Sequence, residues 1–124
     1  KVACITGIYP VCNIASYPGL QRASGAFGLT AQGLEAQLAK HNPIDRLAPL
    51  AKAKVPIFHI HGDMDRLVPL DKNSAIIKQR YDALGSSMTL EVVKGQGHNM
   101  WVGWFQSQAL VDFLIKHATR KAAP

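Results

Sequence analysis

Two apolar segments of the chain each end in a turn that carries an ionisable side chain. Asp65 follows the apolar run that ends at Ile60, and His98 follows the run from Thr89 to Val93. Short apolar runs bounded by turns are typical of buried strands. An acid and a base at the ends of neighbouring parallel strands are two of the three groups of a nucleophilic hydrolase triad. We therefore predict that Asp65 and His98 form a catalytic acid–base pair.

The third group of such a triad is a serine in a G-x-S-x-G turn, and this sequence has no such turn. Ser16 and Ser24 lie in expected loops without the flanking glycines, and we assign neither as the nucleophile. The sequence therefore points to a chemistry that this chain cannot perform unaided.

Two motifs around these side chains resemble those of the α/β-hydrolase family. The pattern H-G-x-x-D-x-x-V-P, from His61 to Pro69, resembles the acid turn after the penultimate core strand of that family. The pattern G-x-G-H, from Gly95 to His98, resembles the histidine loop after the last strand. The family's triad runs Ser, Asp, His along the chain. The order and spacing are similar to those of dienelactone hydrolases, prolyl-oligopeptidase-type peptidases and carbohydrate acetyl esterases.

The resemblance implies a parallel-sheet α/β-hydrolase fold of which residues 1–124 are the C-terminal portion, with the nucleophile elbow upstream of Lys1. It implies a serine hydrolase of carboxylic esters, with acylated carbohydrates as one candidate substrate class, that uses no metal and no organic cofactor. Two alternatives stay open: a serine peptidase of the same fold, and a non-catalytic binding protein with an α/β-hydrolase-like fold. The expected partners are a small-molecule ester and the missing N-terminal half of the domain.

Other side chains near the two motifs have competing interpretations. Asp63 is the competitor of Asp65, although short acidic residues in turns often bond to backbone N–H groups. Tyr9, Met100 and Trp101 are candidate substrate-binding residues, because apolar and aromatic side chains beside a catalytic loop can line a pocket. Packing of the last helix against the sheet is the alternative for the tryptophan, and core packing is the alternative for the tyrosine.

Two histidines lie within the second apolar run. We interpret His59 as a hydrogen-bonded core histidine and His61 as a brace of the acid turn. Because they flank Ile60, we expect them on opposite faces of the strand.

Composition and charge are ordinary for a globular protein. The chain is 48% hydrophobic and 18% charged, and its net charge of +6 comes from dispersed basic residues. Nucleic-acid-binding proteins usually concentrate basic residues on one face, so we expect no nucleic acid partner. No run approaches the roughly 18 apolar residues of a membrane span. Cys4 and Cys12 are expected to be buried free thiols, and no His/Cys cluster has metal-ligand spacing.

Alternation of expected strands and helices indicates a parallel sheet covered on both faces. Residues 9–28 are expected to be a loop or an excursion over the sheet edge. Asn42 is expected to cap a short helix that starts at Pro43. Strands are expected at residues 2–8, 56–60 and 89–93, and helices at residues 30–40, 70–84 and 106–117.

Overall fold

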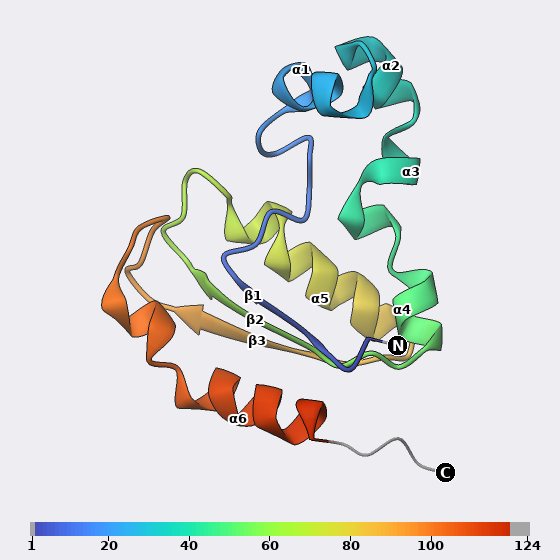
Figure 1. Ribbon diagram of the computed structural model, residues 1–124. Helices are drawn as coiled ribbons and strands as arrows, with labels where there is room; N and C mark the ends of the chain where they lie inside the picture. The colour runs from blue at the N-terminus through green and yellow to red at the C-terminus, as the bar shows by residue number, and fades with distance from the viewer. Residues whose placement is uncertain (1, 120–124) are drawn as a thin grey trace.

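A three-stranded parallel sheet lies at the centre of the computed structural model, which describes residues 2–119 (Figure 1). The strands are β1 (Ile5–Ile8), β2 (Ile57–Gly62) and β3 (Met88–Val93), in the spatial order β1-β2-β3. All three run in the same direction, so their carboxyl ends meet at one edge of the sheet. Ligands of such sheets bind beyond that edge.

The middle strand carries the expected signature of a strand that is covered on both faces. All six residues of β2 are buried, whereas β1 and β3 are mostly half-buried. Within residues 2–119, β1 and β3 are the two edges of the sheet.

Helices connect the strands and cover the sheet. The α-helices are α1 (Leu20–Ala23), α2 (Ala31–Ala36), α3 (Leu38–His41), α4 (Ala48–Lys52), α5 (Ser74–Ala83) and α6 (Gln108–Ala118). The short 3-10 helices are η1 (Ser24–Phe27), η2 (Pro43–Asp45), η3 (Leu70–Lys72) and η4 (Val102–Phe105).

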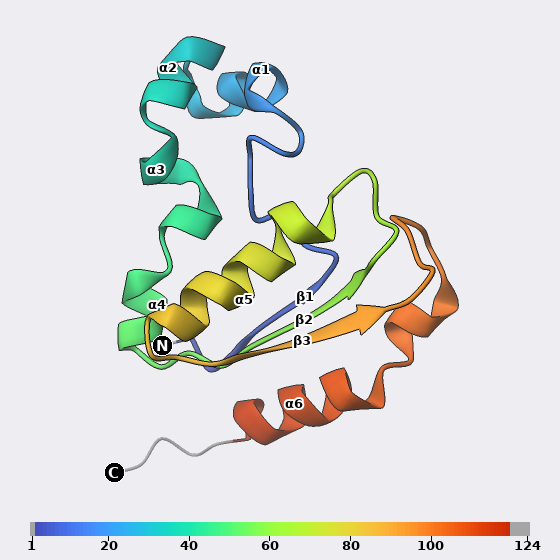
Figure 2. The same cartoon turned by 180° about the vertical axis from the view of Figure 1, so that it is seen from behind.

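Helices α5 and α6 lie on opposite faces of the sheet, as Figures 1 and 2 show. On the α5 side, Ile77 and Tyr81 pack with Ile57 of β2. On the α6 side, Phe58 of β2 packs against Phe113, with ring centroids 5.4 Å apart. Alternate residues of β2 thus fill two separate cores.

Residues 9–53 leave the carboxyl end of β1 and form a helical excursion on the α5 side of the sheet (Figure 2). The outer part has its own small core of Ile14, Ala23 and Leu34. Two fully buried asparagines bind the backbone of residues 12–14, where the excursion begins. Asn73 accepts from the backbone N–H groups of Cys12 and Asn13, and Asn42 accepts from that of Ile14.

The fold class predicted from the sequence is confirmed, and the three strands differ from prediction only at their ends. The expected helix at 30–40 is divided at Gln37, and the one at 70–84 is divided at Asn73. The expected loop at 9–28 contains α1 and η1, which are too short to show a period. Asn42 precedes Pro43 of η2 but makes no capping bond with its side chain.

Both cysteines are free, as predicted. Cys12 is buried, and burial raises the pKa of its thiol to about 12, while Cys4 is only half-buried. Among residues 2–119, no helix combines the length and the apolar character needed to cross a membrane.

Candidate active site

The sheet brings Asp65 and His98 together beyond the carboxyl ends of β2 and β3. His98 donates a hydrogen bond from Nδ1 to Asp65 Oδ2 at 2.9 Å. The Asp65 side chain is fully buried, whereas that of His98 is 28% exposed. An aspartate bound to Nδ1 leaves Nε2 of the imidazole as the ring nitrogen that can exchange a proton with a substrate or nucleophile.

The other carboxylate oxygen of Asp65 is held by its own turn. Oδ1 accepts from the backbone N–H of Leu67 at 3.0 Å and from that of Val68 at 2.8 Å. Hydrogen bonds to an ionised acceptor are stronger than neutral ones. The carboxylate is therefore fixed by three donors, of which the histidine is one.

Asp63, the competing acid, has a different role. It is exposed, and its Oδ1 accepts from the backbone N–H of Gly95 at 2.7 Å. This bond supports the first residue of the histidine loop. The geometry thus favours Asp65 over Asp63 as the partner of His98.

The acid turn and the histidine loop are in direct backbone contact. Met64 donates its N–H to the carbonyl of Gln96 at 3.0 Å. A Cβ atom at Gly62 would lie 2.1 Å from that carbonyl oxygen. Glycine at the end of β2 is therefore required for this approach.

His59 and His61 lie on the same face of β2, since both rings contact the hydroxyl of Ser74. The expectation that they face opposite sides is wrong, because residues two apart on a strand share a face. Burial lowers the pKa of His59 to about 4, with a further contribution from His61, and burial also lowers the pKa of His61. Both rings are therefore neutral near pH 7.

The three predicted substrate-binding residues lie around the histidine loop. Tyr9 follows β1, and its ring centroid is 4.2 Å from that of His98. It has φ 36°, and its hydroxyl donates to the carbonyl of Asn99 at 3.1 Å. Met100 and Trp101 are exposed, and the Trp101 ring packs edge-on against that of Trp104. Their binding roles stay predictions.

Several residues that support the site were not singled out from the sequence. Asn99 accepts with its backbone carbonyl from both Tyr9 and the indole N–H of Trp104, which is fully buried. Asn73 and Ser74 are likewise fully buried and polar. Nothing in their sequence neighbourhood marks them, because their partners are distant along the chain.

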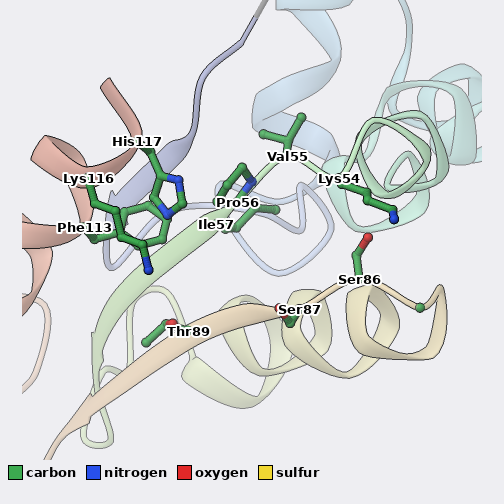
Figure 3. Close-up of a pocket in the computed structure, with 11 residues that line it drawn as sticks. Lys54, Val55, Pro56, Ile57, Ser86, Ser87, Thr89, Phe113, Lys116 and His117 are labelled. Carbon is green, nitrogen blue, oxygen red and sulfur yellow. The ribbon is translucent and has the colours of Figure 1, made fainter. Parts of the chain in front are cut away.

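A cavity lined by residues of three segments lies away from this site. It has a volume of about 460 Å³ and lies between α6, the start of β2 and the loop from α5 to β3 (Figure 3). Ile57 and Thr89, at the amino ends of their strands, line it together with Lys54 and Lys116. It is thus at the opposite end of the sheet from His98. Within the described residues 2–119, no group of three or more His, Cys, Asp or Glu side chains could hold a metal ion.

Comparison with known families gives one match that covers most of the chain. A family model described as phospholipase/carboxylesterase matches residues 13–118. A search of curated proteins found no match.

Solved structures with a similar fold include hydrolases. A truncated carbohydrate esterase from gut microbiota is 28% identical over 66% of this chain and 28% of its own, with a TM-score of 0.52. A thermophilic esterase from the planctomycete Thermogutta terrifontis is 15% identical over 94% of this chain and 44% of its own, with a TM-score of 0.62. The acylaminoacyl peptidase of Pyrococcus horikoshii is 18% identical over 96% of this chain and 21% of its own, with a TM-score of 0.55. The chain thus spans less than half the length of these three proteins.

Proposed function

This chain belongs to the phospholipase/carboxylesterase family of α/β-hydrolases, and from that membership we propose that the protein hydrolyses carboxylic esters, with Asp65 and His98 as two members of a Ser-His-Asp triad. The observation that carries the proposal is the 2.9 Å hydrogen bond between His98 Nδ1 and a fully buried carboxylate. An imidazole held in this way has a fixed tautomer and a stabilised imidazolium form.

The proposed reaction is a two-step acyl transfer. A serine supplied from outside these 124 residues attacks the ester carbonyl while His98 Nε2 takes the hydroxyl proton. His98 then gives this proton to the alcohol oxygen as the ester C–O bond breaks. In the second step His98 takes a proton from water, and the water oxygen attacks the acyl carbon. The bond from that carbon to the serine oxygen then breaks, His98 returns the proton to the serine, and the carboxylic acid is released. These steps involve no metal or organic cofactor.

The proposed substrate class is acylated carbohydrates. The similarity to a carbohydrate esterase at 28% identity supports this choice, whereas the peptidase, at 18% identity, shows the fold alone. Tyr9, Met100 and Trp101 are the proposed substrate contacts, because Tyr9 packs against the ring of His98 and the other two follow His98 in the same loop, where both are exposed.

Labelling with a fluorophosphonate tests the function and locates the nucleophile. The reagent reacts with a serine that has both an activating base and an oxyanion hole. In the protein that contains this chain, we expect one labelled serine outside residues 1–124, and we expect His98→Ala to suppress the labelling. Ser16 and Ser24 should stay unlabelled, since their hydroxyls bond to the carbonyls of Asn13 and Gln21.

The same experiment separates the alternatives. Labelling at Ser16 or Ser24 would contradict the proposed triad. A folded protein without any labelled serine would favour the non-catalytic binding protein. A labelled enzyme that cleaves peptides but not esters would favour the peptidase.

A further inference from the structure

Three buried polar side chains form a hydrogen-bonded chain beneath the acid turn. The Ser74 hydroxyl, at the start of α5, lies 3.0 Å from His59 Nδ1 and 2.8 Å from His61 Nδ1. The other ring nitrogen of His61, Nε2, lies 2.8 Å from the carbonyl oxygen of Val68. His61 and Ser74 have no exposed surface, and His59 is 4% exposed. We call these three residues the buried His59–Ser74–His61 chain.

The donor and acceptor of each hydrogen bond among these three residues follow from the Val68 carbonyl, which His61 contacts. A carbonyl oxygen only accepts, so His61 Nε2 must carry the hydrogen. Burial lowers the pKa of His61, so its ring is neutral and its Nδ1 accepts the hydroxyl hydrogen of Ser74. A hydroxyl has one hydrogen, so Ser74 must accept from His59 Nδ1–H.

Val68 connects the buried His59–Ser74–His61 chain to Asp65. The carbonyl of Val68 accepts from His61, and its N–H donates to Asp65 Oδ1. In addition, His61 Nε2 lies 3.5 Å from Asp65 Oδ2, the oxygen that binds His98. If His61 adopted the other tautomer, the lone pair of Nε2 would face both oxygens and repel them.

We propose that Ser74 is a positioning residue: by donating its hydroxyl hydrogen to His61 Nδ1, it holds the ring so that Nε2–H bonds to the Val68 carbonyl beside the Asp65 carboxylate, and so orients His98. This inference rests on the proposed function for its kinetic consequence, because Asp65 and His98 are the acid and base of that proposal. His59 donates a hydrogen bond from Nδ1 to the Ser74 oxygen, which directs the hydroxyl hydrogen toward His61.

The test compares Ser74→Ala and Ser74→Cys with Ser74→Thr, in the protein that contains this chain. Alanine removes the donor, cysteine provides a weak one, and threonine keeps the hydroxyl. Ser86→Ala is the matched control, because the Ser86 hydroxyl donates to the carbonyl of Ala51 at 2.9 Å, beside the cavity at the amino ends of the strands. The measurements are ¹⁵N NMR of the histidine rings, the low-field proton of His98 Nδ1–H, and ester hydrolysis.

We expect Ser74→Ala to lower kcat about 10- to 100-fold with KM changed less than about threefold, as for partners that orient metal-bound histidines. Ser74→Cys should have an intermediate effect, Ser74→Thr should restore kcat, and Ser86→Ala should leave it unchanged. In Ser74→Ala, the His61 Nε2–H and His98 Nδ1–H resonances should both shift or broaden, because the His61 ring is no longer held at Nδ1.

The NMR signals of His61 and His98 can be measured in a protein that has no esterase activity. The positioning role of Ser74 and the proposed ester hydrolysis can therefore fail separately. Shifted or broadened His61 Nε2–H and His98 Nδ1–H signals in a protein without esterase activity would support the positioning role and reject the proposed function. Unchanged His61 and His98 signals in folded Ser74→Ala or Ser74→Cys would overturn the positioning role, even in an active esterase. An equal loss of kcat in Ser86→Ala would also overturn it.

Discussion

Asp63 and Asp65 are two positions apart in one turn, yet they bind different parts of the histidine loop. Asp63 holds the backbone at Gly95, while Asp65 binds the side chain of His98. The two side chains have the same chemistry and differ in burial: the turn encloses Asp65, whereas Asp63 is exposed to solvent. The chemical role of each side chain is therefore set by its position in the turn.

Substitution of each acid by its amide separates these roles. We expect Asp65→Asn to lower kcat on the order of 10⁴-fold, because an amide neither stabilises the imidazolium nor enforces the Nδ1–H tautomer. Asp63→Asn keeps an oxygen acceptor for the N–H of Gly95 and should lower kcat by less than about tenfold. Steady-state ester hydrolysis measures both. A severe loss in Asp63→Asn with a mild loss in Asp65→Asn would show that the acid is assigned wrongly.

The buried ring of His59 predicts how stability depends on pH. Its pKa is lowered from 6.5 to about 4, so between these values the unfolded chain binds a proton that the folded protein does not. The free energy of unfolding should therefore fall as pH drops from 6.5 toward 4, by on the order of 3 kcal/mol at about 1.4 kcal/mol per pKa unit. Below the folded pKa this contribution should stay constant.

Urea unfolding at several pH values measures this contribution, and His59→Asn is the variant to compare. Asparagine does not titrate but can still donate to Ser74. The variant should be less stable near pH 7 and should lose less stability between pH 6.5 and 4. Parallel pH curves for the two proteins would contradict the prediction.

The sequence predicted the acid–base pair and His61 as a brace of the acid turn, but it did not predict Ser74. Asp65 and His98 each follow an apolar run, so their meeting at one edge follows from the parallel sheet alone. Ser74 is brought to His59 and His61 by the packing of α5 on the sheet, which no local pattern specifies. His59 and His61 share a face of β2, contrary to the expectation, because side chains two positions apart on a strand point the same way.

At the scale of elements, strands were easier to predict than helices. Each strand is a continuous run rich in β-branched and apolar residues, and its burial follows from that composition. The helices α1 to α4 have four to six residues each, too few for an apolar period to show. The loop that leads into them is held by the buried Asn42 and Asn73, whose partners Ile14 and Cys12 are distant along the chain.

The close approach of the acid turn to the histidine loop predicts a sensitive glycine. In Gly62→Ala the added Cβ would meet the carbonyl of Gln96 at 2.1 Å, so the loop must move away. We expect at least a tenfold loss of kcat, because an error of about 1 Å in catalytic geometry can cost about 100-fold. Gly25→Ala is the matched control, since a Cβ there has no neighbour within 4 Å.

Kinetics and thermal unfolding of the two variants decide this point. Normal kcat in Gly62→Ala would mean that the loop adapts without disturbing His98. A comparable loss of kcat in Gly25→Ala would mean that the effect is not specific to the contact between the two loops.

At the scale of the whole molecule, two surfaces of the described chain are of the kind that proteins usually cover. Strand β1 is an edge of the sheet within residues 2–119, so one side of its backbone has no strand partner there. Helix α6 exposes Val111, Leu114 and Ile115, at 41, 37 and 57%. Unpaired strand edges and exposed apolar patches promote association between chains.

We propose that the N-terminal part of the hydrolase domain covers these surfaces, and this proposal predicts the behaviour of the chain by itself. Residues 1–124, purified alone, should aggregate or unfold without a cooperative transition, because the edge of β1 and the apolar residues of α6 would meet solvent or another chain. Light scattering coupled to gel filtration and a thermal melt measure both properties.

Replacing Ile115 by glutamate should reduce aggregation without producing a cooperative melt, since it removes one apolar contact and leaves the strand edge open. A monodisperse monomer with a sharp melt would show that these 124 residues fold independently, and the N-terminal part would then be needed for the nucleophile but not for the fold.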